Sequence, residues 1–278
     1  MPPGRRPTLA DPYEDFARIY DAWQSLYPRP FGLAIAPYIE AAVRKHGVPA
    51  RTLADLACGT GTFAVAWAKR HPDWSVIGQD LSAAMIAVAQ EAARKRPATK
   101  TNVSKKAEMK GRRPQFLVQD LRELALPEPV GLLTCLFDSV NHIRSASGLA
   151  AVFRRMHSVA LPKALLVFDL IDPAQFGETF SGYSISEGPD LYVGMQMDHY
   201  EGRDGVLTGE ARFTFFSRQG AHWSKHESRV VERAWSQVEI TELLEAARFE
   251  IVQVRAIDPS EDPDVFVPRL LWIARAKP

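Results

Sequence analysis

Cysteine is scarce in this chain. Only two cysteines, Cys58 and Cys135, occur among 278 residues, and neither belongs to a CxxC or CxxH pair. That spacing is typical of structural zinc sites and of redox-active thiols, so its absence removes the usual sequence sign of both. Reduced thiols are the rule in cytoplasmic proteins. We therefore expect two reduced, buried thiols in a cytoplasmic protein.

Long apolar runs are also missing. No stretch reaches the ~20 consecutive apolar residues that cross a bilayer. The first segment, MPPGRRPTLADPYEDF, has no apolar core of the kind found in signal peptides. Hydrophobic residues nevertheless make up 46% of the chain and charged residues 24%, which is typical of a globular protein with a substantial core. The sequence predicts no membrane association and shows no internal repeat.

The net charge is close to zero, +1 at pH 7, but it is unevenly distributed. Residues 94–113 contain nine lysines or arginines and one acid, while the other 25 basic and 32 acidic residues give the rest of the chain a charge of −7. A basic run either binds nucleic acid or forms a solvated insertion. This run is expected at the sheet edge opposite to the glycine-rich turn described below. We therefore favour a solvated insertion and expect no nucleic-acid partner.

Short β-rich segments alternate with amphipathic helical segments along the first 170 residues. Strands are predicted at residues 51–57, 74–79, 115–119, 131–137 and 164–170, and helices at 63–70, 83–96 and 148–160. This alternation predicts an α/β fold in which a doubly wound parallel sheet carries helices on both faces. Continuous apolar strands such as GLLTCLF fit a sheet that is buried on both sides.

The pattern changes after residue 170. Three strand-like runs at 191–200, 206–218 and 222–235 are joined by turn dipeptides, which predicts an inserted small antiparallel sheet. A helix follows at 236–247, with Ser236 as N-cap and Glu239 three residues later. Two last strands, at 249–256 and 269–277, bring the main sheet to seven strands.

Four parts are expected along the chain. They are an N-terminal helical cap (1–48), a cofactor-binding core (49–180 and 236–278), the antiparallel insertion (181–235) and the basic loop (94–113) within the core. The insertion is expected to act as a substrate lid or as a contact in a homodimer.

The segment DLACGTGTFAVAWA, residues 55–68, contains the pattern G-x-G-x-x-A at Gly59, Gly61 and Ala64. Between a strand and a helix, this pattern forms the turn that binds dinucleotides. The same turn also binds other adenosine cofactors, so the glycines alone do not identify the ligand.

Three carboxylates distinguish the candidate cofactors. Asp55 lies within the first strand, and a buried carboxylate is costly without a partner such as a ligand ammonium group. Asp80 ends the second strand, where an acid can accept both hydroxyls of an adenosine ribose. Asp120 ends the third, where it can accept from an adenine amino group. Together they favour a ligand that is cationic and lacks phosphates, and they argue against the alternative of an NAD-linked dehydrogenase.

These segments resemble the ordered motifs of the class I S-adenosylmethionine-dependent methyltransferases. DLACGTGT resembles the first motif, with Ala57 where glycine is commoner, a mild departure because alanine is small; IGQDLSAAM, VQDL and LFDSVNHI resemble the next three. The resemblance covers roughly residues 13–277. It implies a seven-stranded Rossmann-like methyltransferase with S-adenosylmethionine as cofactor. The cofactor contacts expected from the acids and the resemblance are Tyr20, Asp55, Ala57, Gly59, Gly61, Asp80, Leu81, Met85 (against the adenine), Asp120, Leu121 and Phe137.

More narrowly, FDSVNHI, the antiparallel insertion and the ending LLWIARAKP resemble small-molecule N-methyltransferases that act on amino sugars or glycine-like amines. The segment ARIYDAWQSLY resembles the N-terminal helix that folds over the cofactor in that group. By this resemblance Tyr20 contacts the methionine carboxylate and Trp23 closes the pocket. The alternative is that both residues lie on the buried face of an amphipathic helix.

Methyl transfer requires mainly that two reactants be aligned and that water be excluded. A neutral amine needs no base, whereas a hydroxyl normally needs one. His142, at the C-terminal end of the fourth strand, is the candidate catalytic base, and Asp138 can contact the substrate or the cofactor. The alternative for His142 is a loop histidine bonded to nearby backbone.

We therefore expect methyl transfer to an amine nitrogen of a small molecule. The alternatives are O-methylation of a small hydroxylated substrate and a non-catalytic methyltransferase-like binding subunit. Further candidates near the insertion are Asp172, Tyr183, His199, His222 and His226. No metal site is predicted, because the four-residue spacing of His222 and His226 within a strand differs from the helical HxxxH geometry.

Overall fold

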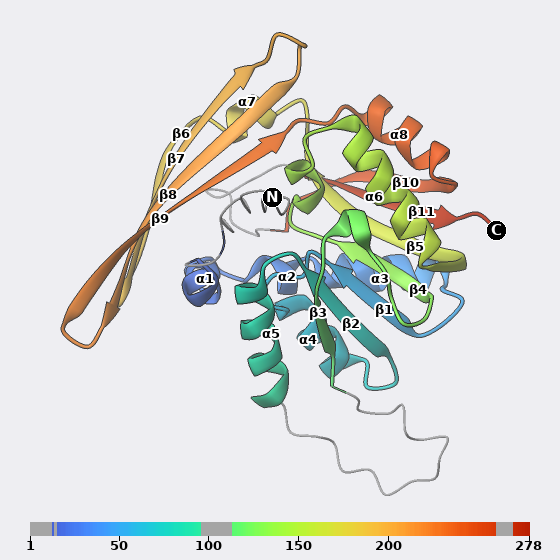
Figure 1. Ribbon diagram of the computed structural model, residues 1–278, viewed down its shortest axis with the longest axis horizontal. Helices are drawn as coiled ribbons and strands as arrows, with labels where there is room; N and C mark the ends of the chain where they lie inside the picture. Colours follow the sequence, from blue (N-terminus) through green and yellow to red (C-terminus); the bar gives the residue numbers. More distant parts are fainter. Residues whose placement is uncertain (1–12, 14–15, 96–112, 260–268) are drawn as a thin grey trace, which may run out of the picture.

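The computed structural model describes residues 13, 16–95, 113–259 and 269–278 (Figure 1). Most of the basic loop expected at 94–113 therefore lies outside the described residues, as does the start of the N-terminal cap expected at 1–48.

A seven-stranded sheet forms the centre of the molecule, in the order β10-β11-β5-β4-β1-β2-β3. Its strands are β1 (Thr52–Leu56), β2 (Ser75–Asp80), β3 (Gln115–Val118), β4 (Val130–Cys135), β5 (Ala160–Ile171), β10 (Phe249–Ile257) and β11 (Arg269–Ala276). Strands β1 to β5 are parallel, and β11 runs antiparallel to its neighbours β5 and β10. The predicted α/β fold, with a doubly wound seven-stranded Rossmann-like sheet, is confirmed.

Helices cover both faces of this sheet. Successive side chains of a strand point to opposite faces, so apolar strands present apolar surface on both sides that the helices bury. On one face, Leu53 of β1 is buried against helices α3 (Ala36–His46), α4 (Thr62–Arg70) and α5 (Ala83–Lys95). On the other face, Leu133 of β4 is buried against α6 (Ala146–Ser158) and α8 (Gln237–Ala246). Helix α8 starts with the predicted capping box of Ser236 and Glu239. None of the described helices is long and apolar enough to cross a membrane.

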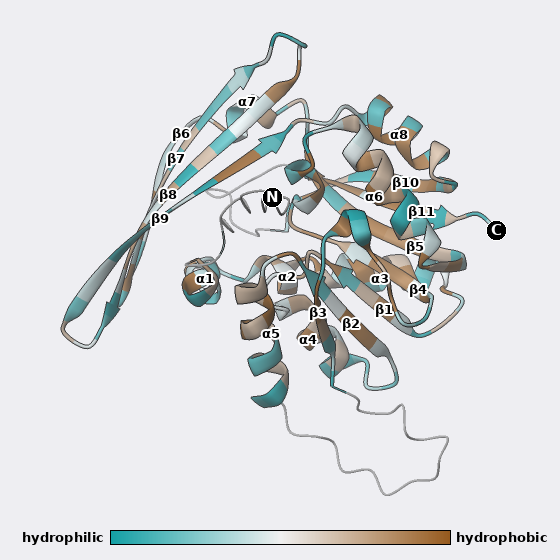
Figure 2. Cartoon of the chain, in the orientation of Figure 1, coloured by the Kyte–Doolittle hydropathy of each residue, from teal (hydrophilic) through white to brown (hydrophobic). Residues whose placement is uncertain are grey.

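A second sheet contains four antiparallel strands in the order β6-β7-β8-β9. They are β6 (Gly182–Gly188), β7 (Leu191–Glu201), β8 (Leu207–Gln219) and β9 (His222–Arg233). The three predicted strands are present, and β6 was missed because its sequence, GYSISEG, has little apolar content. Figure 1 shows these strands as a long twisted ribbon beside the core, and Figure 2 shows that their colouring is more mixed than that of the hydrophobic central strands.

One apolar cluster joins the second sheet to the rest of the molecule. The Phe16 ring lies 5.2 Å from the ring of Phe213 and 5.3 Å from that of Phe215, both in β8. Trp23 of α1 (Ala17–Gln24) and Phe176 of α7 (Phe176–Thr179) belong to the same cluster. The N-terminal helix is therefore held against the second sheet by buried aromatic rings.

Both cysteines are free, and they differ in burial. Cys135 is fully buried in β4, as expected. Cys58 is only half-buried, because it lies in the turn that leaves β1 rather than in the sheet.

Candidate active site

The strand order of the central sheet reverses between β1 and β4. In open α/β sheets, ligands bind beyond the C-terminal ends of the strands at such a reversal. Two turns leave the sheet there: residues 57–61 after β1 and residues 136–142 after β4. They form the two sides of the candidate site.

The turn after β1 depends on two glycines. Gly59 and Gly61 have left-handed backbone conformations, with φ of 55° and 74°, which glycine adopts without steric cost. A Cβ on Gly61 would lie 2.8 Å from the ring of Phe116, so only glycine fits there. Nothing lies within 4 Å of the corresponding position on Gly59, so this side of the turn is open to a ligand.

Ala57 also has a left-handed backbone, with φ of 52°. For a residue with a Cβ this conformation costs about 1–2 kcal/mol. Its small side chain alone would make alanine a mild departure from glycine. The departure is larger than that, because the backbone conformation at this position itself favours glycine. A weak hydrogen bond from the Ala57 N–H to Oε1 of Gln79, at 3.3 Å, helps to hold the residue in place.

Asp80 lies at the end of β2 and binds the glycine turn. Its Oδ2 accepts the N–H of Gly59 at 2.8 Å, and its Oδ1 accepts the N–H of Ser82 at 2.9 Å. Ser82 in turn accepts the Met85 N–H at the start of α5, as expected for an N-cap. The carboxylate is thus fixed beside the open face of Gly59.

Asp55 is buried in β1, with 2% of its surface exposed. Its Oδ1 accepts the hydroxyl of Thr134 at 2.8 Å, and the backbone N–H of Ala64 donates to it as well. Burial raises the pKa of Asp55 to about 7, and the negative charge of Asp80 adds to this effect. The carboxyl group therefore has protein partners of its own and does not depend on a ligand ammonium for a hydrogen bond.

The remaining side chains predicted on this half of the site differ in exposure. Leu81 is 66% exposed beside Asp80, whereas Met85 is 2% exposed and faces the core. Leu121, in η2 (Leu121–Glu123), packs half-buried against the core. Asp120 caps η2, and both its oxygens lie 3.0 Å from Nε of Arg122. That ion pair keeps the pKa of Asp120 below its usual range.

Helix α1 is tied directly to the glycine turn. Oδ1 of Asp21 accepts the hydroxyl of Thr60 at 2.6 Å and that of Thr62 at 3.3 Å. Tyr20, the neighbouring residue, packs its ring edge-on against those of Phe16 and Trp23. The N-terminal helix is therefore joined to the glycine turn by hydrogen bonds that Asp21, the residue after Tyr20, accepts from Thr60 and Thr62.

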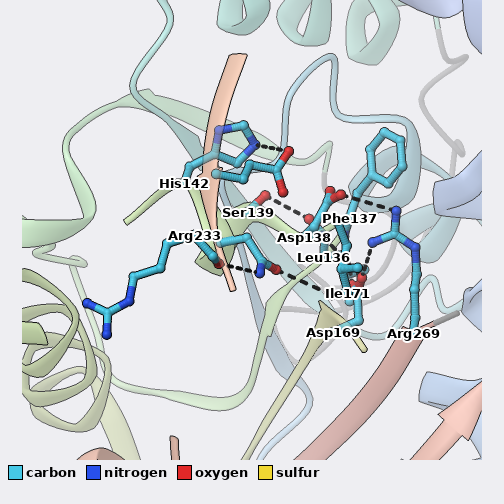
Figure 3. Close-up of polar contacts among 11 residues, drawn as sticks. Leu136, Phe137, Asp138, Ser139, His142, Asp169, Ile171, Arg233 and Arg269 are labelled. Carbon is cyan, nitrogen blue, oxygen red and sulfur yellow. Dashed lines mark hydrogen bonds and ion pairs between the residues drawn. The ribbon is translucent and has the colours of Figure 1, made fainter. Parts of the chain in front are cut away.

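The turn after β4 is built around a buried carboxylate (Figure 3). Phe137 and Asp138 both have positive φ, 59° and 51°, which is rare for residues with a Cβ. Their N–H groups donate to the two oxygens of Asp169 in β5, at 2.7 and 3.1 Å. Asp169 is fully buried, so these bonds hold the turn in its strained form.

Arg269 of β11 supplies the counter-charge for this turn. Its guanidinium donates to Asp169 at 2.8 Å and to Asp138 at 3.2 Å. It also lies over the rings of Phe31 and Phe137, 4.7 and 5.0 Å from their centroids. The two carboxylates raise the pKa of Arg269 further above its usual value.

His142 ends η3 (Ser139–His142) and faces β9 of the second sheet. Its Nε2 lies 3.8 Å from Oε1 of Glu232, and about a third of the imidazole is exposed, against 7% of the Glu232 side chain. Burial lowers the pKa of His142, which keeps the ring neutral at pH 7, and Asp138 partly opposes this effect. Burial and the charge of Asp138 raise the pKa of Glu232 well above its usual range.

Comparison with known proteins identifies the family. A family model described as a methyltransferase domain matches residues 53–163. The dTDP-4-amino-2,3,4,6-tetradeoxy-D-glucose N,N-dimethyltransferase of Saccharopolyspora spinosa is 30% identical over 203 residues, which is 70% of each chain. The chain belongs to the S-adenosylmethionine-dependent methyltransferases.

Solved structures share the methyltransferase fold. An S-adenosylmethionine-dependent methyltransferase from Clostridium acetobutylicum ATCC 824 has a TM-score of 0.75 at 18% identity, over 96% of this chain and 100% of that one. The sugar N-methyltransferase KedS8 from Streptoalloteichus sp ATCC 53650 has a TM-score of 0.69 at 22% identity, over 100% and 99%. At these identities the likeness establishes the fold alone.

The cofactor of this methyltransferase is S-adenosylmethionine, and the described residues fit it. The space above Gly59 allows a ligand to approach the backbone closely. The carboxylate of Asp80 suits a ligand that carries positive charge and no phosphate. Leu81 adds exposed apolar surface beside Asp80.

Four residues that shape the methyltransferase site were missed by sequence reasoning: Asp21, Asp169, Glu232 and Arg269. Asp169 sits inside the apolar strand ALLVFDLI, where a carboxylate signals a specific buried partner. That signal was available in the sequence. Nothing local marked Glu232, because its partners are about 90 residues away in the chain.

The further candidates do not join this site. Tyr183 is exposed in β6, and His222 is exposed at the start of β9. The ring of His199 is held by Ser181 and the carbonyl of Phe180, and Asp172 caps its own turn by accepting the Ala174 N–H. His226 stacks on Phe215, 5.4 Å between ring centroids.

A three-residue cluster could hold a cation, although no metal site was predicted. Asp138, His142 and Glu232 each offer one ligand atom, and these atoms lie within 4.8 Å of one another. His222 and His226 are not part of it. The cluster is the only one of its kind among the described residues.

Proposed function

We propose that this enzyme transfers the methyl group of S-adenosylmethionine to an amine nitrogen of a small molecule. The observation that carries the proposal is the cluster of Asp138, His142 and Glu232 between η3 and β9. Two carboxylates and a neutral imidazole suit a basic acceptor and repel an anionic one. The relative from Saccharopolyspora spinosa, and one from Streptomyces fradiae that is 28% identical over 155 residues, are both named as amino-sugar N,N-dimethyltransferases.

In this proposal the cofactor lies along the turn after β1 and the end of β2. Asp80 accepts the ribose hydroxyls, Gly59 allows close approach, and Leu81 covers the adenine. The other proposed cofactor contacts are Tyr20, Asp55, Ala57, Gly61, Met85, Asp120, Leu121 and Phe137. The Met85 side chain is already buried, so it would support the adenine-binding surface from inside the core.

The parts of the chain then have separate roles. The core, 49–180 and 236–278, binds the cofactor, and the N-terminal helix closes over it through the bond from Thr60 to Asp21. The second sheet, within 181–235, acts as a lid on the acceptor side, because β9 brings Glu232 to His142. A homodimer contact through the second sheet stays a prediction.

When bound, S-adenosylmethionine supplies a methyl group on a positively charged sulfur, which is already reactive toward a nucleophile. The protein must therefore orient the acceptor, exclude water and leave its nitrogen unprotonated at the moment of methyl transfer. His142 can accept a proton because its lowered pKa leaves it neutral at pH 7. Asp138, held by Arg269 at 3.2 Å, orients the acceptor nitrogen.

A methyl-acceptor screen tests the proposal. The purified enzyme and S-adenosylmethionine are incubated with amino sugars, including dTDP-linked ones, with aliphatic amines, amino acids and phenols, and S-adenosylhomocysteine is measured. We expect turnover with an amine and a product methylated at nitrogen by mass spectrometry. Turnover restricted to hydroxyl acceptors would show an O-methyltransferase instead, and tight cofactor binding without any turnover would show a binding subunit.

A further inference from the structure

Glu232 has an unusual environment for a buried carboxylate. Its Oε2 is buried and has no hydrogen-bond partner, and it is the only carboxylate oxygen among the described residues in that condition. Its Oε1 lies 3.8 Å from Nε2 of His142. A buried carboxylate without a cation is costly, and burial accordingly raises the pKa of Glu232. A bound cation would favour the charged carboxylate again.

The groups around Glu232 do not supply a cation for it. His142 faces it from η3 and Asp138 from the turn that precedes η3. The other groups near it are Asp169 of β5, Arg269 of β11 and Tyr13 of the N-terminal segment. Arg269 is the one permanent cation in this set, and its hydrogen bonds go to Asp138 and Asp169. Three acidic groups therefore lie near a single guanidinium, and that guanidinium bonds only two of them.

Hydrogen bonds at the end of β9 hold Glu232 in this position. The next residue, Arg233, accepts the side-chain N–H of Asn141 on its carbonyl at 2.8 Å, and its own guanidinium donates to the carbonyl of Arg144. The end of β9 is thus bonded to η3 on the His142 side. The exposed part of the imidazole, about a third, leaves an approach to the cluster.

We propose that Glu232 binds the acceptor as its ammonium ion, with Oε2 accepting one N–H and the carboxylate of Asp138 accepting another. This inference rests on the proposed N-methyltransferase function and specifies its substrate class: a primary or secondary aliphatic amine that is protonated in solution. An aromatic amine or an amide, which is uncharged at pH 7, does not meet this requirement.

The proton balance of the reaction follows from this arrangement. The bound ammonium gives one proton to Nε2 of His142, and the nitrogen regains its lone pair. The new C–N bond forms as the C–S bond breaks, which leaves a neutral thioether and an N-methylammonium product. The imidazolium of His142 faces Glu232 until it releases its proton to water, so the same carboxylate stabilises the charge before and after methyl transfer.

The test compares Glu232→Gln with the wild type, using the amine acceptor found in the screen. Glutamine has nearly the same shape and removes the charge, so the KM for the amine should rise about 10- to 100-fold. The KM for S-adenosylmethionine should stay within about twofold, and the melting temperature should not fall because glutamine fills the same space without placing a charge in the interior. Unchanged amine KM in the folded variant overturns the inference while N-methylation still stands.

Glu210→Gln is the matched control. Glu210 is a buried glutamate of the adjacent strand β8, but it is paired with Arg212 and Arg229 and is not part of the Asp138–His142–Glu232 cluster. Its replacement should leave the amine KM unchanged. An equal effect of both variants would mean that Glu232 acts only through the stability of the sheet, which also overturns the inference.

Two measurements on the wild type complete the test. The hydroxyl analogue of the acceptor, identical except for its nitrogen, should inhibit at least about tenfold more weakly than a cationic analogue. Equal inhibition overturns the inference.

Activity that is lost with EDTA and restored by Mg²⁺ or Mn²⁺ would assign the cluster to a metal ion and overturn the inference too. If no amine is methylated at all, the proposed function fails, and the inference fails with it.

Discussion

Oδ2 of Asp80 accepts the N–H of Gly59 at 2.8 Å, so the end of β2 is bonded to the turn that leaves β1. The two elements on which the cofactor is expected to lie are therefore a single hydrogen-bonded unit. The bond uses only part of the capacity of the carboxylate, since each oxygen can accept more than one hydrogen bond.

Replacing Asp80 should weaken cofactor binding. We expect Asp80→Ala to cost about 1–3 kcal/mol of binding free energy, the range for hydrogen bonds to a charged group. Calorimetry with S-adenosylhomocysteine measures it, and Asp80→Asn, which keeps one acceptor oxygen, should lose less. A wild-type protein that binds NAD as strongly as S-adenosylhomocysteine would contradict the cofactor assignment of Asp80.

Asp55 should make stability depend on pH. Its pKa is about 7 in the folded protein and near 3.8 when unfolded, so folding keeps the carboxyl group protonated. This contribution is fully present below pH 4 and is lost as pH rises through 7. The wild type should therefore lose stability relative to Asp55→Asn as the pH rises from about 4 to 7. The difference between their free energies of unfolding should grow by up to about 4 kcal/mol and then level off. Urea denaturation at several pH values measures it, and a constant difference would refute the raised pKa.

The buried Asp169 should be critical for stability. Asp169→Asn leaves Arg269 with only Asp138 as a charged partner and weakens the hold on the Phe137–Asp138 turn. We expect a loss of about 3–5 kcal/mol in the free energy of unfolding, the range for breaking a buried ion pair. The exposed pair of Asp190 and Arg218 provides the control, since Asp190→Asn should cost less than about 1 kcal/mol. Similar losses of unfolding free energy in both variants would show that the Asp169 network does not contribute specifically to stability.

His142 should affect rate and pH dependence more than cofactor affinity. For an amine acceptor, His142→Ala should retain part of its activity, and its pH profile should shift upward as more free amine becomes available. For a hydroxyl acceptor, the loss should be about 10²–10⁴-fold because a base is then required. Steady-state rates from pH 6 to 10 distinguish these cases. Full activity at every pH would leave His142 as a loop residue without a catalytic role.

The sequence predicts one half of the site better than the other, for a physical reason. Gly59, Gly61 and Asp80 belong to turns whose geometry is encoded by adjacent residues, so short motifs suffice to locate them. Asp169, Arg269 and Glu232 act through contacts that span about 30 to 130 residues. A single sequence carries no direct sign of such pairings.

Backbone strain was also beyond the reach of motif reading. The segment LFDSVNHI predicts that a functional turn follows β4, but nothing in it indicates that Phe137 and Asp138 have positive φ. That conformation exists because Asp169 accepts both of their N–H groups. The local sequence and a distant strand together determine the turn.

The position of Glu232 in β9 has an evolutionary consequence. The proposed acceptor contact Glu232 belongs to one continuous segment, the four-stranded sheet between β5 and α8, whereas Asp138, His142 and the cofactor half of the site follow strands of the central sheet. Substitution or replacement of that segment can change the acceptor while the cofactor half stays intact. Divergence in substrate choice should therefore concentrate in strands β6 to β9, and a chimera that carries these strands from a relative should inherit the relative's acceptor.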